Sequence, residues 1–469
     1  MKLTLFRSSH RTGVIVGLVA LLVLLLSATA SASGGRLDDN SIRTYEVTIE
    51  NLTNGQPLTP PLLTFHRRYE GYFGVGQPAT FATQQLAENG DLVPAITALN
   101  GDPKALTVVA ADAPLVPAGT PGAATFADSV TLTVRTERAA DLLSVASMLI
   151  CTNDGFTGVD AVHLPHHLGD TVVYYGGSYD AGTEINTEYF GDLVPPCQGL
   201  IGVTGAPGTG ASNPALAEGG VVSTPHAGIQ GGSDLQTAVH GWTDPAVRVT
   251  ITRVPNIRTY EVTIRNLTGG QPLTPPLLAT HDNQFDLFQV GHAASEGIMQ
   301  IAENGNLAPA IEMLNNSAHV LDVVVGDVPL VPAGTPGAAT FPDTVTLTIE
   351  GTDQAKFLSY ASMLVCTNDG FTGLNSYRLP HNVGQSRTTY RYAYDAGTEI
   401  NTEYFGDIVP PCQGLIGVTG DPGTGASNPA LAEGGQIHRH DGIQGITDLL
   451  PEVHGWDGAV VEITITRVD

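Results

Sequence analysis

The heptapeptide RTYEVTI at residues 43–49 occurs again, unchanged, at residues 258–264. In both places Tyr, Val and Ile alternate with polar residues. This is the period of a β-strand with one buried face. The stretch therefore predicts a half-buried strand that opens each of two similar units.

Longer blocks repeat at the same offset of 215 residues. They are PLVPAGTPGAATF at 114–126 and 329–341, YDAGTEINTEYFGD at 179–192 and 394–407, and PGTGASNPALAEGG at 207–220 and 422–435. The period is too long for a solenoid, whose units run about 20–50 residues. A unit of this size can close its own core. We therefore expect two domains, at residues 43–254 and 258–468, joined by a linker at 255–257.

Within each unit most of the regular structure is expected to be strand. Residues 130–135 and 247–254 alternate as half-buried strands, and residues 142–150 form a continuous apolar run typical of a strand buried on both faces. One helix is expected at residues 80–88, before Asn89-Gly90, and a second short helical turn at 92–99. The pattern predicts an all-β chain of two antiparallel β-sandwiches, each with one or two short helices and with its loops gathered at the ends.

Residues 1–32 have the features of a secretory signal peptide. Basic residues precede an apolar run at 13–26, and Ala-Ser-Ala follows at 30–32. The run is shorter than the roughly 20 residues of a membrane span, although an uncleaved anchor is the alternative. We expect a secreted protein that is extracellular or held at the cell surface, without membrane insertion after cleavage.

The composition is strongly acidic. Asp and Glu number 46 against 20 Lys and Arg, for a formal charge of −26. Nucleic acids and anionic membranes are bound through Lys and Arg, so neither is an expected partner. Acidity suits cation binding, but it also suits solubility alone.

The four cysteines fall into one pair per repeat, each separated by 46 residues. A unit that folds by itself should bridge its own pair, which predicts the disulfides Cys151–Cys197 and Cys366–Cys412. Free buried cysteines are the alternative. A tetrahedral metal site is disfavoured because no Cys-x-x-Cys spacing occurs.

Two acidic loop motifs recur in both repeats. The first is CTNDGFTG at 151–158, with Asp154 and its twin Asp369, and the second is YDAGTE at 179–184 and 394–399. Glycines beside carboxylates let backbone carbonyls turn toward an ion, and calcium takes six to eight hard oxygen ligands. The same motifs are also ordinary turn sequences, so spacing alone leaves both interpretations open.

The order of landmarks resembles the spondin N-terminal domain. TYEVTIEN, the helix ending in LAENG, SMLICTNDGFTGVD, YDAGTEINTE, HAGIQG and the closing GWTDPAVRVTITRV carry the resemblance in the first repeat. The family implies a C2-like β-sandwich, a place in cell adhesion or the extracellular matrix, and one calcium ion per domain held by three loop carboxylates. Matched residue by residue, the ligands are Asp154, Asp180 and Glu184 in the first repeat and Asp369, Asp395 and Glu399 in the second.

The resemblance has departures. Gly155 and Gly370 replace the aromatic residue after the first aspartate, Tyr179 and Tyr394 replace a tryptophan, and Glu184 and Glu399 replace a third aspartate. The longer glutamate side chain would shift the position of the ion. This departure affects the expected affinity and coordination geometry more than the expectation that the glutamate is a ligand.

The sequence lacks the GxSxG, HExxH and phosphate-loop motifs of common enzymes. The duplicated histidines, His226 and His440 among them, are expected to be structural or exposed. We therefore expect a non-catalytic calcium-binding module for an extracellular or cell-surface protein or glycan. A secreted polysaccharide- or small-ligand-binding protein is the alternative, and a hydrolase on an unfamiliar scaffold is disfavoured.

Overall fold

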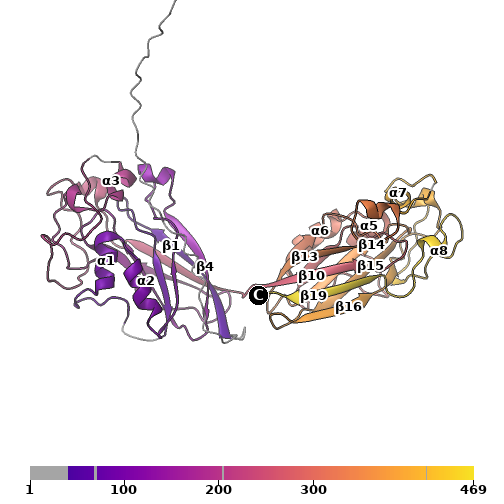
Figure 1. The fold of residues 1–469 in the computed structure, drawn as a ribbon, viewed down its shortest axis with the longest axis horizontal. Helices are drawn as coiled ribbons and strands as arrows, with labels where there is room; N and C mark the ends of the chain where they lie inside the picture. The colour runs from indigo at the N-terminus through magenta and orange to yellow at the C-terminus, as the bar shows by residue number, and fades with distance from the viewer. Residues whose placement is uncertain (1–40, 68–70, 203–204, 419) are drawn as a thin grey trace, which may run out of the picture. The chain divides into compact units, whose positions relative to one another are not determined.

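A computed structural model describes residues 41–469 except 68–70, 203–204 and 419. The expected signal peptide at 1–32 lies outside the described residues. The described chain is mostly strand, arranged in four antiparallel sheets with short helices (Figure 1). The all-β sandwich predicted from the sequence is confirmed.

The first repeat forms two sheets. One sheet has the order β4-β1-β9-β7, with β4 at Ser129–Glu137, β1 at Ile42–Asn51, β9 at Val247–Val254 and β7 at Thr171–Gly176. The other has the order β3-β2-β5-β6-β8, with β3 at Ala105–Ala110, β2 at Leu62–His66, β5 at Leu142–Met148, β6 at Gly155–His163 and β8 at Ser178–Asp180. Tyr45, Val47 and Ile49 of β1 are fully buried in a core that also includes Phe65 and Val145 of the second sheet. The alternation in the opening heptapeptide therefore marks the face that lies between the sheets.

The second repeat follows the same plan. Its first sheet has the order β13-β10-β19-β16, with β13 at Thr344–Gly351, β10 at Arg258–Asn266, β19 at Val461–Arg467 and β16 at Ser386–Arg391. Its second sheet has the order β12-β11-β14-β15-β17-β18, with β12 at Val320–Val325, β11 at Leu277–His281, β14 at Phe357–Met363, β15 at Gly370–Arg378, β17 at Ala393–Asp395 and β18 at His438–Arg439. Each sheet draws its strands from one repeat, although the exact domain boundaries stay a prediction.

Helix α1 at Phe81–Asn89 matches the expected helix closely. The Thr80 hydroxyl accepts from the Thr83 amide at its start, and Gly90 ends it with a φ of 65°. Leu86 and Ala87 pack on Ala146 of β5 and Phe156 of β6. Because α1 covers this face while the other sheet covers the opposite one, all seven residues of β5 are buried, as the continuous apolar run predicted.

The structure has more helices than expected. Helix α2 at Val93–Asn100 was predicted as a helical turn, but α3 at Pro196–Ile201 and α4 at Thr237–His240 were not. Short 3₁₀ turns lie at Pro121–Ala124 and Phe190–Asp192. Helices of six and four residues are too short to leave a periodic pattern in the sequence. The second repeat has the counterparts α5 at Glu296–Asn304, α6 at Ala308–Asn315, η4 at Pro336–Ala339, η5 at Phe405–Asp407, α7 at Pro411–Ile416 and α8 at Pro451–His454.

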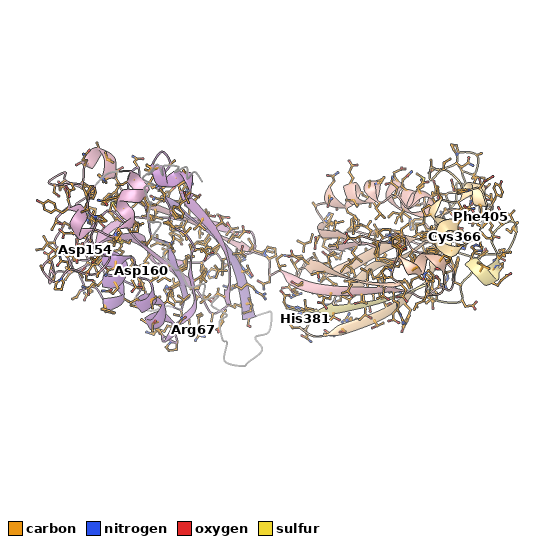
Figure 2. The ribbon with its side chains drawn as sticks, turned by 45° about the horizontal axis from the view of Figure 1, so that its top comes forward. Arg67, Asp154, Asp160, Cys366, His381 and Phe405 are labelled. Atoms are coloured by element: carbon orange, nitrogen blue, oxygen red, sulfur yellow. A yellow bond between two sulfur atoms is a disulfide. The ribbon has the colours of Figure 1, made fainter. Side chains whose placement is uncertain are left out.

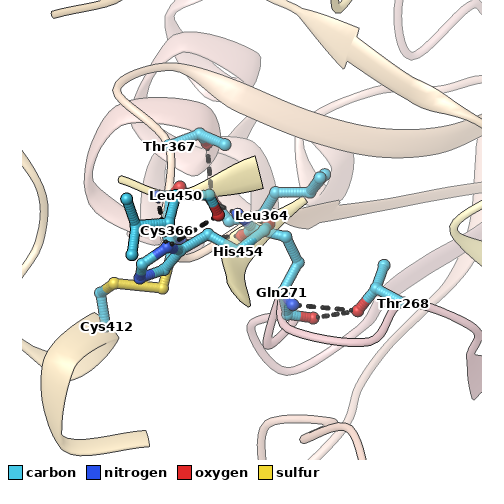
Figure 3. The surroundings of a disulfide bond; sticks show 8 residues. All are labelled: Thr268, Gln271, Leu364, Cys366, Thr367, Cys412, Leu450 and His454. Atoms are coloured by element: carbon cyan, nitrogen blue, oxygen red, sulfur yellow. Dashed lines mark hydrogen bonds between the residues drawn. A yellow bond between two sulfur atoms is a disulfide. The ribbon is translucent and has the colours of Figure 1, made fainter. Parts of the chain in front are cut away.

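Both predicted disulfides are present. Cys151–Cys197 joins the loop after β5 to α3, and Cys366–Cys412 joins the loop after β14 to α7, each with Cα atoms 5.1 Å apart. Figure 3 shows the second bridge beside buried Gln271. The Gln271 side-chain amide exchanges hydrogen bonds with the backbone of Cys366 at 3.0 Å and donates to the His454 carbonyl at 2.8 Å. The bridge and this glutamine together fix the loop that carries Asp369.

Candidate metal centre

Asp154 lies in the tight turn between β5 and β6 and is fully buried. Its Oδ2 accepts hydrogen bonds from the Thr183 and Glu184 amides at 2.7 and 3.1 Å and from the Thr183 hydroxyl at 3.2 Å. Its Oδ1 is buried without a hydrogen-bond partner. Burial, and then the neighbouring Asp180 charge, raise the pKa of Asp154 to about 6. One oxygen of this carboxylate is therefore held by three hydrogen bonds while the other is unsatisfied; Figure 2 labels Asp154 in the first repeat.

Asp180 ends β8 and pairs across the sheet with Gly155. Its Oδ1 accepts from the Gly182 amide at 2.8 Å, and its Oδ2 accepts from the Asn186 side chain at 2.7 Å. Gly182 has a φ of 67°, a conformation that costs glycine little and that turns the chain back toward Asp154. The structure thus brings together Asp154 and Asp180, two of the three residues that the resemblance implied as ligands.

A histidine that was expected to be structural or exposed completes the group. One possible ligand atom from each of Asp154, Asp180 and His226 lies within 4.8 Å of the others. The His226 Nε2 is 3.8 Å from the Asp180 Oδ2, and its ring packs against Trp242 with centroids 5.4 Å apart. The duplicated HAGIQG and HDGIQG motifs were the available sequence signal, because each places a histidine in a loop that returns to the acidic turn.

The hydrogen bonding of His226 limits what it can ligate. Its Nδ1 accepts from the Gly228 amide at 2.9 Å, so the ring proton of the neutral side chain sits on Nε2. Burial lowers the pKa of His226, with the Asp180 charge opposing this effect. A protonated Nε2 has no lone pair for a metal, so in this tautomer the possible ligands in the group are carboxylate oxygens. That donor set suits hard cations such as calcium better than zinc.

Glu184, the predicted third ligand, lies outside this group. Its main-chain amide donates to Asp154, but its Oε1 accepts from the Asn213 amide at 2.8 Å. Burial raises the pKa of Glu184 to about 7, and the charges of Glu88, Asp154 and Asp192 add to the rise. The Glu184 side chain therefore lies near other acidic residues, Glu88 and Asp192. Its role as the third calcium ligand stays a prediction.

The second repeat reproduces most of this arrangement. Asp369 is fully buried, its Oδ2 accepts from the Thr398 and Glu399 amides, and its Oδ1 has no hydrogen-bond partner. Burial, and then the Asp395 charge, raise the pKa of Asp369 to about 6. Asp395 differs from Asp180 because its Oδ1 lies 3.7 Å from Nδ1 of the exposed His438. Among the described residues, only the first repeat brings three such possible ligand atoms within 4.8 Å of one another.

Two other polar clusters in the described chain have structural roles. His66 Nε2 lies 2.9 Å from the Ser144 hydroxyl, which donates to Asp160, but Ser144 is only 3% exposed and cannot reach a substrate. The Glu188 carboxylate accepts from the Gln230 and Gly232 amides and thereby holds a loop in place. Neither arrangement offers an accessible nucleophile with an adjacent base.

No described helix is both long and apolar enough to span a bilayer.

Comparison with known proteins shows that residues 272–407 match the Spondin_N family model. The matched stretch contains Cys366, Asp369, Asp395 and Glu399. No curated protein matched the chain. The Spondin_N match at 272–407, the β-sandwich fold and the two disulfides together point to a spondin-like, non-catalytic module of the extracellular kind.

Proposed function

We propose that this protein is a secreted calcium-binding module of the adhesion or extracellular-matrix type, with spondin-like domains in tandem at 43–254 and 258–468. Calcium is held by Asp154 and Asp180 in the first domain and by Asp369 and Asp395 in the second. The partner is an extracellular or cell-surface protein or glycan.

The observation that carries the proposal is the unsatisfied oxygen of Asp154. A fully buried carboxylate oxygen without a donor is costly, and a second carboxylate beside it adds repulsion. A bound cation removes both penalties. The same unsatisfied oxygen recurs on Asp369, so the feature belongs to both repeats.

Calcium fits the residues present better than other common metals. The donors are carboxylates on glycine-containing loops, and calcium accepts flexible coordination that carbonyls and water can complete. Magnesium needs a near-ideal octahedron, and the His226 tautomer leaves no nitrogen ligand for zinc. A calcium ion would tie the loop after β5 to the loop after β8.

The repeated sandwich supports a binding role. Two sites on one chain give avidity for a repetitive surface. A catalytic site gains less from such duplication.

The test is calorimetry of the full chain after chelator treatment, with and without calcium at millimolar concentration. Extracellular modules bind calcium at about 10⁻⁴–10⁻³ M, and calcium at about ten times such a constant adds roughly 1.4 kcal/mol per site. Melting should rise with calcium and much less with magnesium. Asp180→Asn with Asp395→Asn should abolish the calcium effect.

The matched control is Asp112→Asn with Asp327→Asn, which removes the same charge from exposed, equivalent positions. This control should keep the calcium shift. A wild-type protein whose melting is unchanged by millimolar calcium would refute the proposal.

A further inference from the structure

A pocket of about 300 Å³ lies in the second repeat, and neither Asp369 nor Asp395 lines it. Glu303 at the end of α5, Glu399 and Asp407 of η5 line it, together with the loop at 423–429. Among the described residues that line it, three are acidic and none is basic. Phe405, which begins η5, is labelled in Figure 2.

Glu303, one of the residues that line the pocket, has a buried and unsatisfied oxygen. Glu303 is only 6% exposed, and its Oε2 has no hydrogen-bond partner. Burying an ionised carboxylate without a donor or a counter-charge is unfavourable. A cation nearby would stabilise this oxygen as well as relieve the repulsion among the acids.

The other two carboxylates are positioned by neutral donors. Glu399 Oε1 accepts from the Asn428 amide at 2.8 Å, and Asp407 Oδ2 accepts from the Thr402 hydroxyl at 2.8 Å. Burial raises the pKa of Glu399 to about 7, with the charges of Glu303, Asp369 and Asp407 adding to it. The Glu303 and Asp407 charges thus act on Glu399. None of the described residues that line the pocket is basic.

We propose that Glu303, Glu399 and Asp407 form a second cation site in this repeat, which takes a partly hydrated divalent ion of the calcium type. This site uses Glu399, which the sequence had suggested as a ligand of the first ion. The volume is well above what a single water molecule needs, so an ion that keeps several of its waters can enter. Asn304 and Ser427 also line the pocket and add neutral oxygen atoms.

The first repeat provides an internal comparison. Glu88 corresponds to Glu303 and also has an unpartnered Oε2, but its Oε1 accepts from Gln84 at 2.7 Å. Met299 occupies the position of Gln84 in the second repeat and cannot donate. Glu303 therefore depends more on a cation than Glu88 does, and we assign the stronger site to the second repeat.

The test counts calcium ions bound to the full chain by equilibrium dialysis at pH 8, which is above the Glu399 pKa of about 7. In the Asp180→Asn, Asp395→Asn background, which removes the ligands proposed above, about one ion per chain should remain. Adding Glu303→Gln should remove that ion, and adding Glu399→Gln should do the same while keeping an oxygen for the Asn428 amide. Adding Glu312→Gln, an exposed acid on α6, should leave it bound.

The outcomes separate the two proposals. If the background variant binds no calcium, or if its residual ion survives both glutamine substitutions, the second site is refuted and the first can still stand. If wild-type binding falls with Glu303→Gln but not with Asp180→Asn and Asp395→Asn, the second site stands and the first fails. Circular dichroism should show the glutamine variants folded, because the change removes a buried charge.

Discussion

Replacing Asp369 by asparagine should stabilise the calcium-free second repeat at pH 8. A rise of the Asp369 pKa from 3.8 to about 6 corresponds to roughly 3 kcal/mol of unfavourable ionisation in the folded state. Asparagine removes that cost. Its side-chain oxygen can still accept from the Thr398 and Glu399 amides, and its amino group can donate toward Asp395.

The sign of the pH dependence follows from linkage. A carboxyl whose pKa is raised on folding stabilises the folded state at pH values below its pKa in the unfolded chain. This stabilisation is lost as the pH rises through its pKa in the folded protein. The wild-type protein should therefore lose stability between about pH 4 and pH 6, and the Asp369→Asn variant should lose less. The free energy of unfolding of the variant should be close to that of the wild type at pH 4 and about 3 kcal/mol higher at pH 8.

Tryptophan fluorescence can isolate the second repeat. The chain has two tryptophans, one per repeat, and Trp456 packs on the core of the second. In a Trp242→Phe background, urea unfolding in chelator followed through Trp456 should give the stability of this repeat. Asp327→Asn is the control. A variant less stable than wild type at pH 8, or equally stabilised at pH 4 and pH 8, would refute the reasoning.

Four further predictions concern the scaffold. Cys151→Ser with Cys197→Ser should destabilise the first repeat by about 3–4 kcal/mol, because the bridge closes a long loop; chemical denaturation without reductant checks this. Peptide mapping without reduction should show no bridge between the repeats. Residues 36–254 expressed alone in an oxidising compartment should melt cooperatively, since both sheets of the first repeat are drawn from this range, and a non-cooperative melt would contradict the boundary. Gln271→Ala should cost about 2–4 kcal/mol, measured by thermal unfolding, because it leaves the backbone of Cys366 and His454 without partners; an unchanged melting temperature would show that water replaces the side chain.

The scaffold was largely predictable because its signals are local. Strand alternation at 43–49 shows directly which side chains are buried, and the Thr80 and Gly90 caps sit next to the helix they bound. The disulfides followed from the duplicated spacing. These features depend on residues near one another in the sequence or on the exact repeat.

The site was predictable only in part, because its geometry depends on loops that return from distant positions. Asp154 and Asp180 were found together as expected. The Glu184 side chain lies elsewhere because the Asn213 amide binds it, and His226 joins the group through a loop more than 40 residues further along the chain. The Glu303 pocket brings together α5, η5 and the loop at 423–429, and no motif in the sequence links them.

The two disulfides also make the proposed ion sites depend on oxidation. Cys151 lies three residues before Asp154, and Cys366 three residues before Asp369. Reduction would free the turn that presents each buried aspartate and so weaken its hold on a cation. The proposed sites would then become competent for calcium only after the two disulfides have formed.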